Sequence, residues 1–173
     1  LGLYKQEPVS NLDIYTTKTK GTIAGEGAAF FLLSNEPSAT DYAKLEGLHT
    51  FYKPKNIAAI EKQISAFMER QSVNINDIDL IITGRNGDAT FDKMYEQLSQ
   101  SIFAGRKTAN YKNLCGEYPT SSAFALWLAV HIIKTGKLPV MLQQADSTNN
   151  IKRVLIYNNY LGIHHSFYLA AAC

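Results

Sequence analysis

The chain has 173 residues, of which 46% are hydrophobic and 18% are charged, and its formal net charge is +2. This length suits one domain with a real core, and the interspersed acidic and basic residues include no basic run that could follow a phosphate backbone, which argues against nucleic-acid binding. The longest strongly apolar stretch, 123–133, is shorter than the ~20 residues of a membrane span, so no span is expected.

Cysteine usage and the N-terminal residues bear on the setting of the protein. Cys115 and Cys173 are too few and too unpatterned for a disulfide framework or a zinc site, so we expect a reducing, cytoplasmic environment. The chain opens with LGLYKQEPVS, without an initiator methionine and without a signal-peptide pattern. A processed terminus and a piece cut from a longer polypeptide both fit this opening.

The first predicted elements are two strands and a helix. Residues 25–33 (GEGAAFFLL) form a continuous apolar run opened by glycines, which favours a strand covered on both faces. Residues 42–48 are a candidate for a short second strand. After Pro54, apolar residues recur at helical spacing and predict a helix with one buried stripe. The stripe consists of Ile57, Ile60, Ile64, Phe67 and Met68.

The middle of the chain predicts a further strand and helix. Residues 77–84 (DIDLIITG) have the pattern of a short buried strand that ends at Gly84. Asp88 has the residue type and position of an N-cap for the next helix. The polar segment 102–113 contains a possible short strand. One face of the predicted helix consists of Phe91, Met94, Tyr95, Leu98 and Ile102.

A third helix is predicted at about 119–134, from Pro119 in its first turn to Lys134, with Gly136 behind it as a C-terminal cap. Residues 123–130 show no polar face, so we expect this helix to be buried between two layers. One sheet and two amphipathic helices do not supply both layers.

The chain closes with two predicted strands, 153–159 and 164–172, joined in a hairpin at Gly162. Strands that alternate with helices, followed by a terminal hairpin, indicate an α/β layer with a mixed sheet.

Four stretches, in this order, resemble motifs of the β-ketoacyl-ACP synthases, the condensing enzymes of the thiolase superfamily. GTIAGEGAAFFLL resembles the strand G-E-G-A-x-x-x-L-L, and IDLIITGRNGDATFD resembles H-G-T-x-T-x-x-x-D. YKNLCGEYPTSSAFAL resembles K-x-x-x-G-H-x-x-G-A-x-G, and YNNYLGIHHSFYLA resembles N-S-F-G-F-G-G-x-N. Each motif alone is weak, whereas the ordered set covers nearly the whole chain.

The resemblance implies the thiolase-like fold, in which two similar βαβαβαββ halves pack into five layers. Residues 1–173 would be the C-terminal half, with a mixed five-stranded sheet and a buried helix that packs on its counterpart in the first half. The N-terminal half, which carries the nucleophilic cysteine of the family, would be absent, and Cys115 does not correspond to that cysteine.

The resemblance also implies a chemistry that this sequence lacks. Family members transfer an acyl chain to the cysteine thiolate, and two histidines then assist decarboxylation of malonyl-carrier protein and hold the enolate oxygen as neutral hydrogen-bond donors. Counted from Asp92, the first histidine position falls on Gly84; counted from Lys112, the second falls on Glu117. Glycine offers no side chain, and an ionised glutamate repels an enolate. We therefore assign no catalytic residue.

Five residues are candidates for lining or supporting the pocket. Lys112 and Asp92 match the supporting lysine and acid of the family, although an ordinary lysine and a first-turn helix acid fit the pattern too. A Lys112–Glu117 ion pair is the alternative that we favour. Asn86, in the loop that carries the first histidine of the family, could contact a phosphopantetheine arm or lie in solvent, and so could Arg85. Gly162 lies in the glycine-containing turn.

The other conspicuous side chains favour structural roles. A cysteine packed under a helix is a better reading of Cys115 than a reactive thiol. His164 and His165 are adjacent on a predicted strand and therefore point to opposite faces, so neither a substitute for a lost histidine nor a metal pair is favoured. Tyr95 stands where the family often has a further acid.

These observations predict a β-ketoacyl-synthase-like domain for acyl-chain elongation in fatty-acid or polyketide-type biosynthesis. We expect it to be non-catalytic, comparable to a chain-length factor or a fragment. Half of an active condensing acyltransferase and an unrelated α/β binding module remain open. The expected partners are acyl carrier protein and either the missing half or a ketosynthase subunit, in a homo- or heterodimer. No metal and no cofactor beyond the carrier's phosphopantetheine arm are expected.

Overall fold

The computed structural model describes residues 2–142 and 150–173. They form one mixed sheet with the strand order β1-β5-β4-β2-β3. The bounds of its strands are β1 Lys44–Tyr52, β2 Leu80–Thr83, β3 Thr108–Asn110, β4 Arg153–Tyr160 and β5 His164–Ala171. β5 is antiparallel to both β1 and β4, whereas β2 is parallel to both β4 and β3. The five-stranded mixed sheet predicted from the sequence is confirmed.

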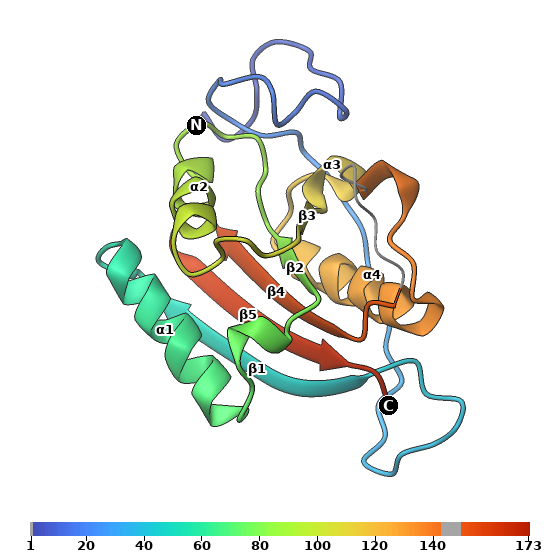
Figure 1. The fold of residues 1–173 in the computed structure, drawn as a ribbon. Coiled ribbons are helices and arrows are strands. Elements are labelled where there is room, and N and C mark those ends of the chain that lie inside the picture. Colours follow the sequence, from blue (N-terminus) through green and yellow to red (C-terminus); the bar gives the residue numbers. More distant parts are fainter. Residues whose placement is uncertain (1, 143–149) are drawn as a thin grey trace.

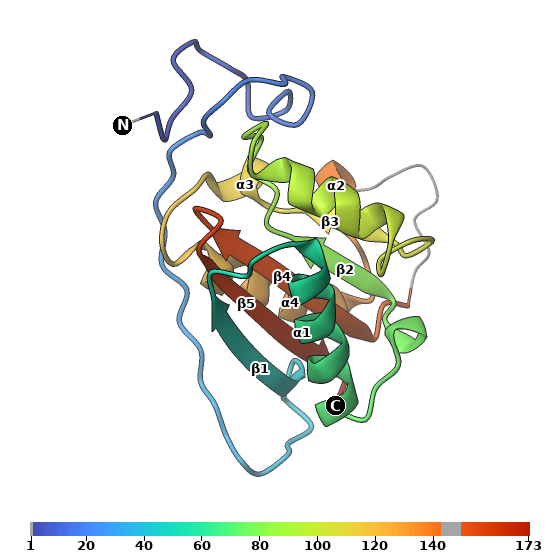
Figure 2. The same ribbon diagram turned by 90° about the vertical axis from the view of Figure 1, so that its left-hand side faces the viewer.

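Helices cover both faces of this sheet (Figures 1 and 2). Their bounds are α1 Ile57–Arg70, α2 Asp92–Gln100, α3 Lys112–Cys115 and α4 Ser121–Thr135, with short 3₁₀ turns at Ile75–Asp77 and Val140–Leu142. α1 and α2 pack on one face and α4 on the other, with one apolar cluster under each layer. The order of strands and helices is that of one βαβαβαββ half, with the small α3 added ahead of α4.

The predicted helices are confirmed, although α4 begins at Ser121, so that Pro119 lies outside its first turn; side-chain caps account for the start of α1 and for the turn before α2. Asn56 accepts a hydrogen bond from the Ala59 amide at 3.0 Å and so caps α1. Asp88 accepts from the amides of Thr90 (2.7 Å) and Phe91 (3.2 Å), and its carbonyl accepts from Asp92 at 2.9 Å. Asp88 therefore caps the turn that leads into α2, one turn earlier than the helix itself.

The described residues cover one side of helix α4 and leave its other side open. Ala125, Leu128 and Ile132 are buried against the sheet. On the other side Trp127 is 40% exposed and Phe124 is half-buried. The sequence predicts that this helix packs between two layers. The described chain supplies one of them, the sheet, so this prediction is confirmed for one side of the helix. Gly136 ends the helix in the left-handed conformation with φ 65°.

The strand predicted at 25–33 is wrong. This segment is an extended coil along one side of the molecule (Figure 2), and Phe30 is 92% exposed. It begins next to a single bridge between Ala24 and Glu117. A strand needs a neighbour for its backbone amides and carbonyls, and no described strand pairs with this apolar run. The first strand is β1, which begins within the short second strand predicted at 42–48 and extends beyond it.

The remaining sequence predictions agree with the structure at the level of elements. The short strand expected within 102–113 is β3, and the hairpin is β4–β5 with Gly162 at φ 64° in its turn. Across residues 2–142 and 150–173, no helix has both the length and the hydropathy needed to cross a membrane.

Candidate functional site

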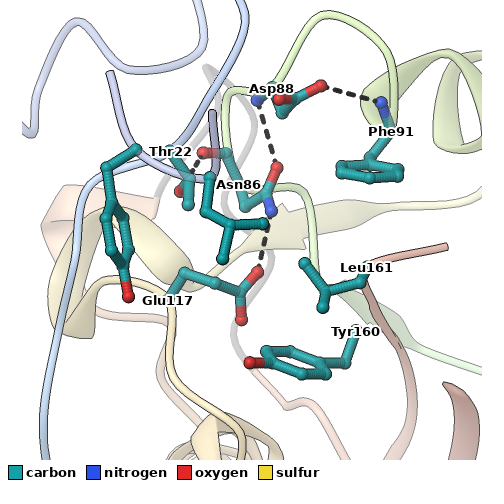
Figure 3. A pocket seen from close by; sticks show the side chains of 9 residues that line it. Thr22, Asn86, Asp88, Phe91, Glu117, Tyr160 and Leu161 are labelled. Carbon is teal, nitrogen blue, oxygen red and sulfur yellow. Dashed lines mark hydrogen bonds between the residues drawn. The ribbon is translucent and has the colours of Figure 1, made fainter. Parts of the chain in front are cut away.

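Three loops that follow the parallel strands meet at one edge of the sheet. Residues 84–91 follow β2, residues 111–120 follow β3 and residues 161–163 follow β4. The carboxyl ends of parallel strands are where α/β proteins place their ligands. A small cavity lies there, which we call the Glu117 pocket (Figure 3). Its wall includes Thr22, Asn86, Asp88, Phe91, Glu117 and Tyr160.

Glu117 in the wall of this pocket forms a buried ion pair with Lys112, which lies behind it. Lys112 is 1% exposed and Glu117 is 5% exposed, and Lys112 Nζ lies 2.5 Å from Glu117 Oε2. Burial lowers the pKa of Lys112, while the charge of Glu117 and its hydrogen bond oppose that shift. Asn86 Nδ2 donates to the same oxygen at 2.7 Å, and Ser121 Oγ donates to Oε1 at 3.4 Å. The carboxylate is therefore fully partnered from within the chain.

Asp92 holds the loop after β2 and does not pair with Lys112. Its carboxylate accepts from the backbone amides of Asn86 (3.0 Å) and Gly87 (3.1 Å) and from Arg85 Nε (3.2 Å). Burial raises the pKa of Asp92, and these donors oppose the shift. Asp92 is therefore a loop-positioning residue.

The N-terminal segment covers the same loop, a contact that no pattern in the sequence indicated. Asp88 accepts a hydrogen bond from the Gly21 amide at 2.5 Å, and Thr22 Oγ1 donates to the Asn86 carbonyl at 2.6 Å. Leu3 and Tyr4 add apolar wall to the pocket. Residues 3–22 carry no periodicity or motif, so only the structure could place them.

The space beside Gly84 is already filled. A Cβ atom there would lie 2.3 Å from Asn158 Oδ1 and 2.9 Å from the Tyr95 hydroxyl. That hydroxyl accepts from the backbone amide (2.9 Å) and the side-chain Nδ2 (3.0 Å) of Asn159, and burial raises the pKa of Tyr95. Tyr111 donates to Asn158 Oδ1 at 2.9 Å. No histidine fits at Gly84 without displacing this network.

The other candidate residues lie outside the pocket. Cys115 is half-buried, and burial raises the pKa of its thiol to about 11, so it is protonated at neutral pH. His164 is exposed and His165 is buried beneath α1 and α2, on opposite faces of β5 as the sequence predicts. Gly162 lies in the hairpin turn and lines a neighbouring groove instead.

The Glu117 pocket is too small for the chemistry that the resemblance implies, and its wall lacks the neutral imidazole donors which that chemistry needs. Its volume of about 20 Å³ has room for about one water molecule. No imidazole lines it, and within the described parts of the chain no group of three or more His, Cys, Asp or Glu residues is placed to hold a metal ion. The site offers a neutralised carboxylate and amide groups, which bind and position rather than transfer protons.

Comparisons with known proteins agree with this geometry at the level of the fold. The ishigamide ketosynthase/chain length factor matches 76% of this chain with a TM-score of 0.65 and 14% identity. The chain has the fold of a ketosynthase half. A structure of a type II polyketide synthase acyl-carrier protein in complex with its ketosynthase, bound to the hexaketide, matches 76% with a TM-score of 0.61 and 14% identity. A β-ketoacyl synthase from Burkholderia phymatum matches 78% with a TM-score of 0.61 and 11% identity.

The ketosynthase fold is present here only in part. The chain spans 38%, 39% and 38% of those three structures, respectively. No family model matches the sequence, and neither does any curated protein. The likeness to the ketosynthase fold that the four motifs predicted is therefore shown by the structure, while identities this low say nothing about activity.

Proposed function

We propose that this chain is the C-terminal half of a ketosynthase-like protein that shapes a site for a carrier-bound acyl chain without catalysing condensation. The setting would be fatty-acid or polyketide-type assembly in the cytoplasm. The observation that carries the proposal is the buried Lys112–Glu117 pair, which occupies the place where the resemblance calls for a neutral imidazole.

The chemistry of condensation explains why this pair matters. An enolate is stabilised by donors that are already oriented and carry no negative charge. Glu117 accepts hydrogen bonds and cannot donate one while it is ionised. Its charge is balanced by Lys112. The filled space at Gly84 leaves no room for a side chain at the other histidine position of the family. The site therefore supports positioning, as in a chain-length factor, better than proton transfer.

The proposal includes a complementary half as partner. Phe30 and Leu32 are almost completely exposed in the unpaired 25–33 segment, and Trp127 is exposed on the open side of α4. Large apolar side chains that lie this exposed are candidates for an interaction surface. A second thiolase-like half, from the same polypeptide or from a ketosynthase subunit in a homo- or heterodimer, would cover this side and supply the layer that α4 lacks.

The second proposed partner is an acyl carrier protein. One of the similar structures is named as a ketosynthase in complex with an acyl-carrier protein, which supports this choice. The phosphopantetheine arm of the carrier would be the sole prosthetic group involved. Asn86 and Gly162 are the candidate contacts, because they line adjoining cavities at the loop edge of the sheet.

The decisive experiment measures decarboxylation and condensation with malonyl-carrier protein, for this chain and for the full-length protein. We expect carrier binding without release of CO₂ both for wild type and for Glu117→Gln, with circular dichroism used to check that the variant is folded, because the substitution leaves Lys112 buried without its partner. Turnover by this chain would overturn the proposal. Turnover by the full-length protein that Glu117→Gln abolishes would favour the alternative, half of an active condensing acyltransferase.

Partner assembly has its own test. Trp127→Glu should lower the melting temperature of the full-length protein more than that of this chain, because Trp127 is 40% exposed here and loses only its ring contacts with Phe124 and His131. Lys137→Glu is the matched control, since it changes an exposed residue just beyond the end of α4. Equal effects of the two variants on the full-length protein would argue against a partner on this face.

A further inference from the structure

A second and larger cavity adjoins the first on the α1 and α2 side of the sheet, between α1, α2 and the β4–β5 turn. We call it the His165 groove, and its wall includes Asn56, Ile57, Ile60, Met94, Leu161 and His165. Its volume of about 310 Å³ is at the lower end of the range for small-molecule sites. Phe91 and Leu161 line both cavities and separate them.

His165 gives this groove a polar group without a partner. Its side chain is 3% exposed, and its Nε2 is the single buried side-chain nitrogen or oxygen without a hydrogen-bond partner among the described residues. Nδ1 lies 2.8 Å from the Tyr157 hydroxyl, and Tyr157 is not part of the groove wall. The Nε2 edge of the ring therefore faces the groove side. A buried polar atom without a partner costs free energy and calls for an explanation.

The neighbours of His165 determine which nitrogen carries the proton. The Tyr157 hydroxyl has one hydrogen and two neighbouring acceptors, His165 Nδ1 at 2.8 Å and Met94 Sδ at 3.2 Å. An imidazole nitrogen is a much stronger acceptor than a thioether, so we assign the single hydroxyl hydrogen to Nδ1 rather than to Met94 Sδ. Burial lowers the pKa of His165 to about 4, partly opposed by the Gly162 backbone, so the ring is neutral. Nε2 then carries the proton and is a neutral donor.

The rest of the wall indicates the kind of molecule that fits. Ile57, Ile60 and Met94 provide an apolar surface, and no Asp, Glu, Lys or Arg lines the groove. Asn56 contributes a side-chain amide at the rim; its Oδ1 is held by the α1 cap. An ionised ligand would find no counter-charge here, whereas a neutral one would find apolar contact and a donor.

We propose that the His165 groove binds a small neutral molecule with a short apolar body and a carbonyl oxygen, which accepts a hydrogen bond from His165 Nε2–H. This site adjoins the Glu117 pocket, and Gly162 of its wall is also a proposed contact of the phosphopantetheine arm; the hydrogen bond from His165 does not depend on the proposed acyl-assembly function. It could be occupied whether or not the chain takes part in condensation.

The test uses two probes that differ only at the acceptor, 2-hexanone and 2-methyl-1-hexene, in which a CH₂ group replaces the oxygen. Binding to this chain labelled with ¹⁵N-histidine is followed by the shift of His165 Nε2. We expect saturable millimolar binding of 2-hexanone with movement of this signal, and affinity for the alkene lower by about fivefold, as one neutral hydrogen bond provides.

Three variants complete the experiment. His165→Phe keeps the ring stacking and should weaken 2-hexanone binding about fivefold, whereas His164→Phe, the same change on the exposed face of β5, should have no effect. Ile57→Trp should abolish binding by filling the groove. If His165→Phe fails to fold, the two probes on wild type and Ile57→Trp still decide. Equal affinity for ketone and alkene, or unchanged binding to Ile57→Trp, would overturn the proposal.

Discussion

The two cavities on either side of Phe91 and Leu161 differ in size and in how their polar groups are satisfied. The Glu117 pocket holds about 20 Å³, and its carboxylate has three partners within the chain. The His165 groove holds about 310 Å³, and its buried Nε2 has none. The comparison teaches that resemblance to a family points to a set of positions, while ligand capacity depends on which polar groups the fold leaves unpaired.

Removing Lys112 should give the largest effect. Lys112→Ala leaves the Glu117 carboxylate buried without its cation, and we expect a loss of about 3–5 kcal/mol in the free energy of unfolding, measured by urea denaturation. The double variant Lys112→Met with Glu117→Leu replaces both charges by apolar groups and should cost far less. A loss below about 1 kcal/mol for Lys112→Ala would mean that the pair is solvated and the Glu117 pocket is open.

Cysteine labelling should show that no activated thiol lies beside the Glu117 pocket. Burial raises the pKa of Cys115 from 9.0 to about 11, which lowers its thiolate fraction at pH 7.5 by about 100-fold. Iodoacetamide should therefore modify the exposed Cys173 first, as followed by mass spectrometry of digested peptides. Cys173→Ser provides the matched control, in which labelling should become slow overall. Faster labelling of Cys115 than of Cys173 would contradict the burial and the raised pKa of the Cys115 thiol.

A side chain at Gly84 should also destabilise the chain. Gly84→Ala brings Cβ within 2.3 Å of Asn158 Oδ1, and overpacking of this kind costs about 1–3 kcal/mol, measurable by urea denaturation. Its cost should fall in an Asn158→Ala background, because that variant removes the nearest atom. Additive costs in the double variant would show that the space beside Gly84 is free, and the argument against a histidine there would fail.

Much of the fold could be predicted because hydrophobic periodicity and cap residues act locally. The stripe from Ile57 to Met68, the Asp88 turn and the hairpin at Gly162 are properties of short segments. The prediction of a strand at residues 25–33 was wrong, because a strand requires a neighbouring strand as well as a suitable composition. An apolar run predicts burial, and in the described chain nothing pairs with this one.

The sequence could predict which positions form the candidate site, but not most of the contacts that their side chains make. Spacing within the motifs located Gly84 and Glu117, and charge complementarity suggested the Lys112–Glu117 pair, which the structure contains. Asp92 could not be assigned to the loop amides, because backbone donors leave no trace in a sequence. Nε2 of His165 is left without a partner because Tyr157 bonds the other ring nitrogen. Tyr157 lies eight positions earlier, on the adjacent strand, so no sequence motif predicts this arrangement.

The smallest expected effect is a pH dependence that belongs to the His165 groove. The pKa of His165 is about 4 in the folded state against a usual 6.5, so between these values the unfolded chain binds more protons than the folded one. The contribution of His165 to stability should therefore be complete above pH 6.5 and be lost as the pH drops toward 4, by about 1–2 kcal/mol after allowance for solvent screening.

His165→Phe should flatten this slope in urea titrations at several pH values, whereas His164→Phe should keep it. The raised pKa of Asp92 works in the opposite direction, favouring the folded state as the pH falls, but both variants retain it, so the difference between them isolates His165. Equal slopes for the two variants would show that folding leaves the pKa of His165 at its usual value, which would contradict the burial of this ring.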